Sequence, residues 1–298
     1  MLDPETDAGW LRPAAAAAGL LLLWQLESLQ KHPPRPRNPS RLLHAVRNLT
    51  LGAINALVLR AVAAGFTAAA TEWLTTTQTG LLYALTLPSA IRPVLALLLL
   101  DFWTWYWHRA CHRVPFLWRF HRVHHSDPAM DVTTAFRFHP AELLLSTIIR
   151  LPVLALIGVT VTELLVYETL LLASSQFQHA ALSGGRWDQA LRRVLVTPSV
   201  HRIHHSPERP LTNSNYASLL NCWDRLFGTW RPPAEEDLPA NAAAPECGLH
   251  GLHEEHWQTI SGLILNTAMH PDLQPQTHRL SDADSPCRPE RSLPPDQD

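Results

Sequence analysis

Long apolar stretches dominate the first 180 residues of this chain, and they constrain its fold more than any other feature. A helix needs ~20 mostly apolar residues to cross a membrane, and isolated charges inside such a helix are tolerated where they face a bundle interior or a site. We therefore expect an all-α, multi-span bundle with about four to five membrane-embedded helices. Buried helices of a soluble α-helical protein are the alternative that hydropathy leaves open. The stretches are Pro13–Leu26, Leu51–Thr71, Thr86–Trp107 and Leu143–Phe177, the last of them long enough for two crossings.

The overall composition excludes several classes of protein. Hydrophobic residues make up 46% of the chain and charged residues only 17%, which is below the usual ~25% and argues against a disordered chain. The net charge of -2 provides no basic surface for nucleic acid. The four Cys residues form no CxxC pair, so we expect no disulfide scaffold and a reducing compartment.

The distribution of charge predicts an orientation in the membrane. The segment Lys31–Arg47 holds five Lys or Arg and no acid, as is typical of a cytoplasmic connection. The acidic residues before Pro13 suit an outside start and a retained anchor rather than a cleaved signal peptide. The third helix would then bring His108 to the cytoplasmic face, and the hairpin would return His179 to it. We expect an integral, multi-pass protein of a bacterial inner membrane, with a cytoplasmic helical cap carrying the histidines.

Three regions differ in their residue content. Residues 1–47 are expected to form the anchor helix and basic loop, and residues 48–230 a membrane-embedded catalytic domain. Residues 231–298 form a Pro-rich tail, partly disordered, with one short helix near His253–Ala268. The run DFWTWYW at 101–107 places aromatic residues directly before His108. Such a run fits the membrane–water boundary, although it could also line a lipid channel.

Histidine is the residue type that points to function. Ten of the 17 His residues fall between His108 and His205. Side chains at positions i and i+4 share one helix face, so each box can direct two or three imidazoles to one region. Eight imidazoles exceed the four ligands of a tetrahedral zinc and suit two metal ions, without choosing among iron, zinc, copper and nickel. The boxes are HRACH at 108–112, HRVHH at 121–125 and HRIHH at 201–205.

Further histidines are candidates of unequal strength. His179 ends the second half of the hairpin, where an imidazole needs a polar partner, and a nearby metal centre would provide one. His139 precedes Pro140, a plausible helix start, and could be a ligand, a support for a ligand or a helix cap. His250, His253 and His256 form an HxxHxxH pattern in the tail, but this spacing is common by chance.

The box segments resemble the fatty acid hydroxylase/sterol desaturase superfamily of integral membrane enzymes. The resemblance rests on DFWTWYWHRACHRVPFLWRFHRVHHS at 101–126 and VTPSVHRIHHSPERPLTNSNYASLLNCWDRLFGT at 196–229, with FRFHPAE and QFQHA in order between them. It covers roughly residues 48–230. The chain departs from the family pattern at Ala181, where Asn is frequent, and at Asn213–Ala217, where Asp-x-Asn-Tyr-Gly is frequent. These departures remove no ligand, but they leave the lipid open.

The resemblance implies a non-haem diiron centre that uses O2 to hydroxylate or desaturate a lipid, either sterol-like or fatty acyl. Because the chain has neither GxGxxG nor CxxCH, its electrons must come from a separate cytochrome b5-, ferredoxin- or reductase-like protein. By position, the resemblance assigns the iron ligands to His108, His112, His121, His124, His125, His179, His201, His204 and His205, with His139 as a possible addition.

Two other functions use the same residues. A metal-dependent membrane hydrolase, or a zinc-binding membrane protein without redox activity, would need neither O2 nor reductant. A lipid-binding scaffold with a degenerate centre is a third possibility, but all eight box histidines are present. The sequence identifies neither the lipid nor the choice between hydroxylation and desaturation.

Overall fold

The computed structural model describes residues 4–30, 40–62, 64–233, 247–269 and 273. Every regular element among these residues is a helix, and the β-type contact they contain is an isolated bridge between Leu195 and Leu220. The all-α class is therefore confirmed for the described part of the chain. The longer helices are α1 (Pro4–Leu29), α2 (Arg41–Val62), α3 (Ala64–Thr77), α5 (Ile91–Arg113), α6 (Pro115–His125), α7 (Pro140–Ile157), α8 (Val161–His179) and α13 (Ile260–Met269).

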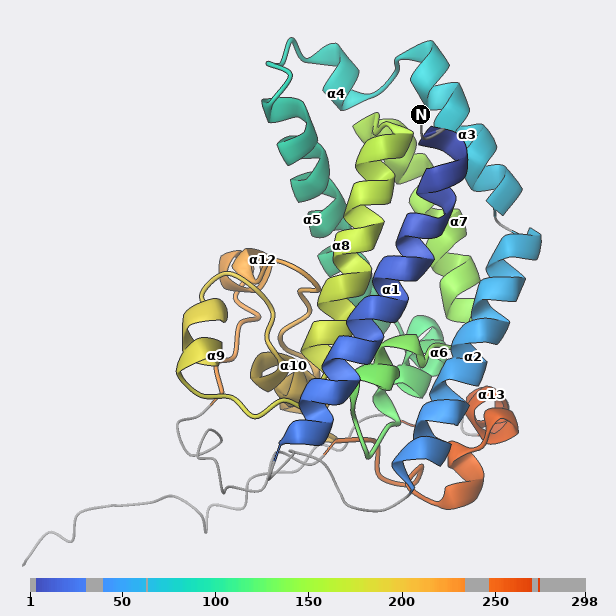
Figure 1. Ribbon diagram of the computed structural model, residues 1–298, viewed down its shortest axis with the longest axis vertical. Helices are drawn as coiled ribbons and strands as arrows, with labels where there is room; N and C mark the ends of the chain where they lie inside the picture. Colours follow the sequence, from blue (N-terminus) through green and yellow to red (C-terminus); the bar gives the residue numbers. More distant parts are fainter. Residues whose placement is uncertain (1–3, 31–39, 63, 234–246, 270–272, 274–298) are drawn as a thin grey trace, which may run out of the picture.

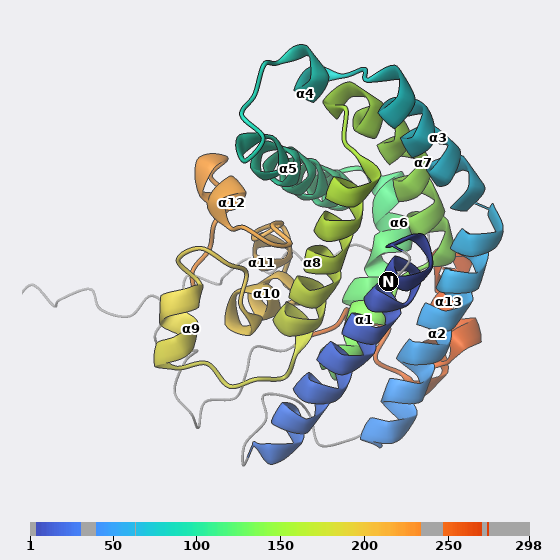
Figure 2. The ribbon, with the colours of Figure 1, turned by 45° about the horizontal axis from the view of Figure 1, so that its top comes forward.

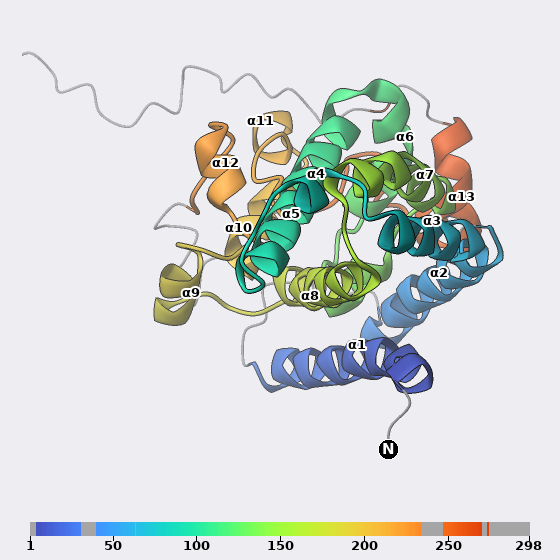
Figure 3. The same ribbon diagram turned by 90° about the horizontal axis from the view of Figure 1, so that it is seen from above.

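The long helices form a bundle, and most of the short elements gather at one of its ends. Figure 1 shows α1 running alongside α8, with α4 at one end of the bundle and α9 and α10 at the other. Figure 2 shows the same alignment of α1, α2 and α8, and Figure 3, viewed along the bundle, places α1 at its periphery. The short elements are α4 (Leu81–Ala84), η1 (Val132–Phe136), α9 (Arg186–Leu191), α10 (Pro198–His204), α11 (Arg209–Thr212), α12 (Cys222–Leu226) and η3 (Glu255–Gln258).

Local signals divide the apolar stretch after residue 140 into α7 and α8. Pro140 occupies the first turn of α7, and His139 caps it by accepting the backbone N–H two residues on, at 3.0 Å from Nδ1. Gly158 ends α7 with φ 78°, a conformation that favours glycine. Thr160 and Glu163 then start α8 with a reciprocal capping box. The stretch therefore forms two helices, as its length predicts.

The second apolar stretch differs from the expectation. We predicted one element over Leu51–Thr71, whereas α2 begins at Arg41 and α3 begins separately at Ala64. The expected loop over Lys31–Arg47 is wrong for residues 41–47, which are helical; residues 31–39 lie outside the described part of the chain. The reason is tertiary, because Arg41 pairs with the buried Glu27 at 2.5 Å, and such a partner cannot be identified from local sequence.

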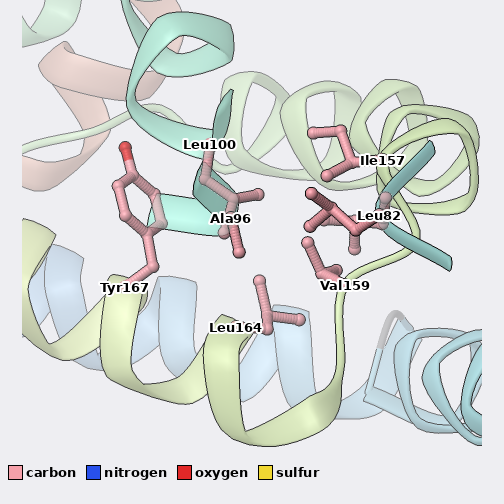
Figure 4. Close-up of a cluster of buried hydrophobic side chains, with 8 residues drawn as sticks. Leu82, Ala96, Leu100, Ile157, Val159, Leu164 and Tyr167 are labelled. Carbon is pink, nitrogen blue, oxygen red and sulfur yellow. The ribbon is translucent and has the colours of Figure 1, made fainter. Parts of the chain in front are cut away.

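A buried hydrophobic cluster holds together the end of the bundle opposite the boxes (Figure 4). Close backbone approach contributes to it, since a Cβ on Gly80 would lie 2.5 Å from Cα of Gly158. Two glycines therefore allow the α4 segment to contact the end of α7. The cluster consists of Leu82, Ala96, Leu100, Leu154, Ile157, Val159, Leu164 and Tyr167.

Two of the described helices are long and apolar enough to cross a membrane, namely α2 and α7. Only 28% of the apolar window of α2 and 17% of that of α7 is buried inside the protein. Large apolar side chains such as Leu57 and Ile148 are consequently exposed. This exposure is typical of a lipid-facing surface and unlike the core helices of a soluble protein.

Part of the tail packs against the helices that carry the boxes. The short helix expected near His253–Ala268 is present as α13, preceded by η3. Leu252 and Trp257 are buried against Trp118 of α6, and the guanidinium of Arg122 donates to the carbonyl of Asn266 at 2.5 Å. Residues 247–269 therefore support the box region, while the Pro-rich end of the tail lies outside the described residues.

Candidate metal centre

The fold brings all nine of the histidines assigned as ligands to one buried region. Each box lies at or near the end of a helix, where the spacing of three or four residues aligns its imidazoles on one face. The helices that carry them are far apart in sequence but meet at the same end of the bundle. The contributions are His108 and His112 from α5, His121, His124 and His125 from α6, His179 from α8, and His201, His204 and His205 from α10 and its C-terminal cap.

These imidazoles fall into two groups, each compact enough to surround one metal ion. Within a group, one nitrogen of every imidazole lies within 4.8 Å of a nitrogen of all the others. Neighbouring positions of one box are divided between the groups, because adjacent side chains on a helix point in different directions. The first group is His108, His112, His121, His125 and His204, and the second is His124, His179, His201 and His205.

Hydrogen bonds to Nδ1 fix the tautomer of several of these imidazoles. A carbonyl oxygen can only accept, so an Nδ1 that faces one must carry the proton. In a neutral imidazole this leaves Nε2 with a free lone pair, the form that binds a metal. The carbonyl acceptors are Tyr216 for His108 (2.7 Å), Arg137 for His124 (3.2 Å), Ser175 for His179 (2.6 Å) and Ser214 for His204 (2.7 Å).

The Nε2 lone pairs of these imidazoles point at one another. Nε2 of His108 lies 3.0 Å from Nε2 of His204, and Nε2 of His124 lies 3.0 Å from that of His179. With both Nδ1 atoms protonated, neither contact has a proton to share, and two lone pairs at this distance repel. Both nitrogens of His125 are also buried without a hydrogen-bond partner among the described residues. A cation among these atoms removes the repulsion, so the donor set fits a metal ion in each group.

Burial keeps imidazoles of α6 and α10 neutral. Desolvation, followed by the neighbouring imidazoles, holds the pKa of His125 and of His205 well below its usual range. For His204, burial lowers the pKa to about 3 despite the hydrogen bond to Ser214. Neutral imidazole is the ligand form, so these side chains need no deprotonation near pH 7.

One histidine has a carboxylate in place of a carbonyl. Nδ1 of His121 lies 2.7 Å from Oε1 of the buried Glu142, at the start of α7. The other carboxylate oxygen, Oε2, is buried and has no hydrogen-bond partner among the described residues. The thiol of Cys111 lies within 4.8 Å of both side chains. Nothing in the spacing of Glu142 along the sequence relates it to His121.

A buried polar network holds the end of α6 where the second box stops. The carboxylate of Asp127 receives hydrogen bonds from His44 at 2.9 Å and from Thr134 at 2.7 Å. Burial opposes ionisation of Asp127, but His44 and Arg137 outweigh it and hold its pKa well below the usual range. Arg137 also donates to Ser126 at 2.9 Å and thereby fixes the residue after the box. No sequence pattern indicates this network.

The remaining candidate histidines lie outside both groups. His139 caps α7 and contacts Phe120, with 5.1 Å between ring centroids, so of its three expected roles the structure shows the helix cap. His250 and His253 are neighbours in the tail, 5.7 Å apart between centroids. Nδ1 of the exposed His256 instead lies 3.3 Å from the carboxylate of Glu254. The HxxHxxH pattern therefore does not join the buried groups.

Comparison with known proteins identifies the box region. Residues 93–229 match the family model "Fatty acid hydroxylase". This segment contains all nine histidines of the two groups. The resemblance to the fatty acid hydroxylase/sterol desaturase superfamily, expected from the boxes, is confirmed for it. No solved structure matches the chain.

Several curated proteins are similar over about half of the chain. Alkylglycerol monooxygenase of Danio rerio is 32% identical over 146 residues, which cover 45% of this chain and 32% of the relative. The Homo sapiens alkylglycerol monooxygenase is 31% identical over 141 residues, covering 47% and 31%. Ornithine lipid hydroxylase of Rhizobium tropici is 31% identical over 146 residues, covering 49% and 44%. The chain therefore spans less than half the length of each of these relatives.

Proposed function

Because residues 93–229 form a fatty acid hydroxylase segment, we propose that the protein is a membrane-bound, iron-dependent oxidoreductase that hydroxylates a C–H bond of a lipid. The observation that carries this proposal is the pair of buried imidazole groups with converging lone pairs. The similar curated proteins are named as an alkylglycerol monooxygenase and an ornithine lipid hydroxylase. Their names favour hydroxylation over desaturation. They also favour a lipid with a polar headgroup over a sterol.

We assign one iron ion to each imidazole group, which gives ligand sets of five and four histidines. When bound, the two iron ions would supply the activation of O2 and the oxidation of an unactivated C–H bond. The chain orients the imidazoles through carbonyl acceptors and through Glu142. The negative charge of Glu142 makes Nε2 of His121 a stronger metal ligand. Burial of both groups keeps bulk water away from the reacting atoms.

The membrane arrangement that we propose is the one expected from the sequence. The helices α1, α5 and α8 join α2 and α7 in about four to five membrane-embedded elements, with the boxes on a cytoplasmic cap of a bacterial inner membrane. The clustering of α6, α9 and α10 at one end of the bundle supports a single cap (Figure 1). Residues 48–230 form the catalytic unit in this proposal, and residues 247–269 brace it through α6.

Electrons have to be supplied from outside the chain. The sequence contains neither GxGxxG nor CxxCH, so we propose a separate protein donor. The cytochrome b5-, ferredoxin- and reductase-like classes remain equal candidates, because the sequence motifs do not separate them.

The test combines oxygen labelling with metal analysis. Purified protein in lipid nanodiscs, loaded anaerobically with ferrous iron, should hold close to two iron ions per chain. After reductant and ¹⁸O₂ are added together with a lipid extract, mass spectrometry should detect one ¹⁸O atom in a product lipid. Product formation without O2 and reductant would support the metal-dependent hydrolase instead. Retained oxidation at one metal ion per chain would contradict the two-iron assignment.

A further inference from the structure

An exposed surface of mixed apolar and basic character lies next to the box region. It is built on α12 and on the segment that follows α9. Leu226 is 70% exposed, Val194 59% and Phe227 48%, although such side chains are usually buried in a soluble protein. Arg193 and Arg225, also exposed, lie among them. We name this set of five residues the α12 surface.

The α12 surface is a rigid part of the fold and not a loose loop. The backbone N–H of Asn221 donates to the carbonyl of Val194 at 3.0 Å, which joins the two segments. Arg225 donates to the carbonyl of Arg192 at 3.2 Å and lies over the ring of Trp230, with 4.2 Å to the ring centroid. These contacts therefore hold the two segments in fixed positions relative to each other.

The same surface continues the aromatic run of α5. The ring of Phe227 stacks on Trp105 at 4.5 Å between centroids and contacts Phe102 at 5.8 Å. Trp223 donates from Nε1 to Asp101 at 2.9 Å. Figures 1 and 3 both show α12 directly beside α5. Because the aromatic run is expected at the membrane–water boundary, this contact places α12 at the same depth.

The charge of the surrounding segments is positive. Residues 183–196 and 219–231 contain five Arg and two Asp. Both acids are buried: Asp188 accepts from Ser199 at 2.6 Å, and Asp224 accepts from Trp105 at 2.9 Å. These two described segments therefore expose arginine without any exposed acid. Basic residues next to protruding apolar side chains are typical of a surface that binds anionic lipid.

We propose that the α12 surface contacts the membrane, with Leu226 and Phe227 in the interfacial layer and Arg193 and Arg225 at anionic lipid headgroups. This inference rests on the membrane orientation given above, but not on the lipid hydroxylase activity. An acidic electron-donor protein could also bind arginine. The continuity with the aromatic run of α5 and the exposed apolar side chains favour lipid, and the donor becomes an outcome of the test.

The experiment measures the depth of a spin label in the full-length protein. The label is attached at Leu226→Cys, with Cys222→Ser and Cys287→Ser to remove competing thiols; Cys111 and Cys247 are buried. Nanodiscs contain either phosphatidylcholine alone or phosphatidylcholine mixed with anionic phosphatidylglycerol. We expect the label to collide more with O2 and less with a water-soluble nickel chelate in the anionic discs. Arg193→Gln should remove this lipid-dependent shift.

Two control labels calibrate the measurement. A label at Ile148→Cys, 57% exposed on α7, should report acyl chains, and one at the exposed Glu208→Cys should report water. If Ile148 is in lipid while Leu226 remains in water in both discs, the α12 inference is overturned and the membrane orientation stands. If the label at Ile148 is in water, both the α12 inference and the proposed membrane orientation are overturned. Protection of Leu226 only after addition of an acidic ferredoxin would overturn lipid contact in favour of donor docking.

Discussion

At the scale of single residues, the site depends on which nitrogen of each imidazole carries the proton. The protonated Nδ1 of His204 faces the carbonyl of Ser214, so only its Nε2 can serve as a ligand. His204 is one of the five imidazoles of the first group. Loss of a ligand should therefore lower metal content and activity together.

His204→Ala tests this expectation. The variant should insert into the membrane normally, lose most of its bound iron and form no oxidised lipid. Elemental analysis and lipid mass spectrometry on the same preparation measure both quantities. The matched control is His256→Ala, because His256 is exposed and lies outside both groups; it should retain iron and activity. Full activity in His204→Ala would rule out a ligand role for this histidine.

Glu142 should act by positioning His121 and not by binding metal. Glu142→Gln keeps an oxygen that accepts the hydrogen bond from Nδ1 of His121 but removes the negative charge next to it. We expect turnover to fall ~10–100-fold with most of the metal kept, as for other residues that orient a ligand. Iron content and the optical spectrum of the loaded protein distinguish this result from ligand loss. Glu208→Gln, an exposed control, should behave like wild type.

At the scale of elements, α1 is more than a membrane anchor. Its buried Glu27 accepts the backbone N–H of Val132 at 2.8 Å and of Ala181 at 2.7 Å. Val132 follows the second box, and Ala181 follows His179. One carboxylate on α1 therefore fixes the start of η1 and the segment that follows α8, and it pairs with Arg41 of α2 as well.

Glu27→Gln should consequently destabilise the protein. The substitution removes the charge and the acceptor oxygen that face the guanidinium of Arg41 and places an amide NH2 group there instead, at a cost of about 1–3 kcal/mol. A lower midpoint in thermal unfolding of the nanodisc-embedded protein would confirm this. Glu72→Gln, an exposed position on α3, controls for charge removal. An unchanged midpoint in Glu27→Gln would mean that the ion pair with Arg41 does not stabilise the fold.

At the scale of the whole molecule, the two ends of the bundle should lie on opposite sides of the membrane. Glu208 and Glu254 are exposed and lie next to α11 and η3. Gln78 lies between α3 and α4, and Figure 1 shows α4 at the end of the bundle opposite α10. Single Cys at these positions can be labelled from either side of intact cells. We expect Glu208→Cys and Glu254→Cys to react only from the cytoplasm and Gln78→Cys only from outside. Reaction of all three from one side would contradict a transmembrane bundle.

Sequence patterns alone predict the helical class, the family of residues 93–229 and the histidines that come together. Spacings of three and four residues place imidazoles on one helix face whatever the neighbouring helix is, so His121 and His125 could be paired from local geometry. The starts of α7 at Pro140 and of α8 after Thr160 can also be predicted from local sequence, because a helix cap depends on residues within one turn.

The packing of the helices, and not the sequence pattern, divides the imidazoles into groups of five and four and sets which residues orient them. Glu142 reaches His121 from 21 residues away, and His44 reaches Asp127 from 83 residues away. Such contacts depend on how helices pack and leave no periodic signal in the sequence. The start of α2 at Arg41 was not predicted for the same reason. A charged helix end resembles a loop in the sequence, and only the packing of α1 against α2 shows its buried partner, Glu27.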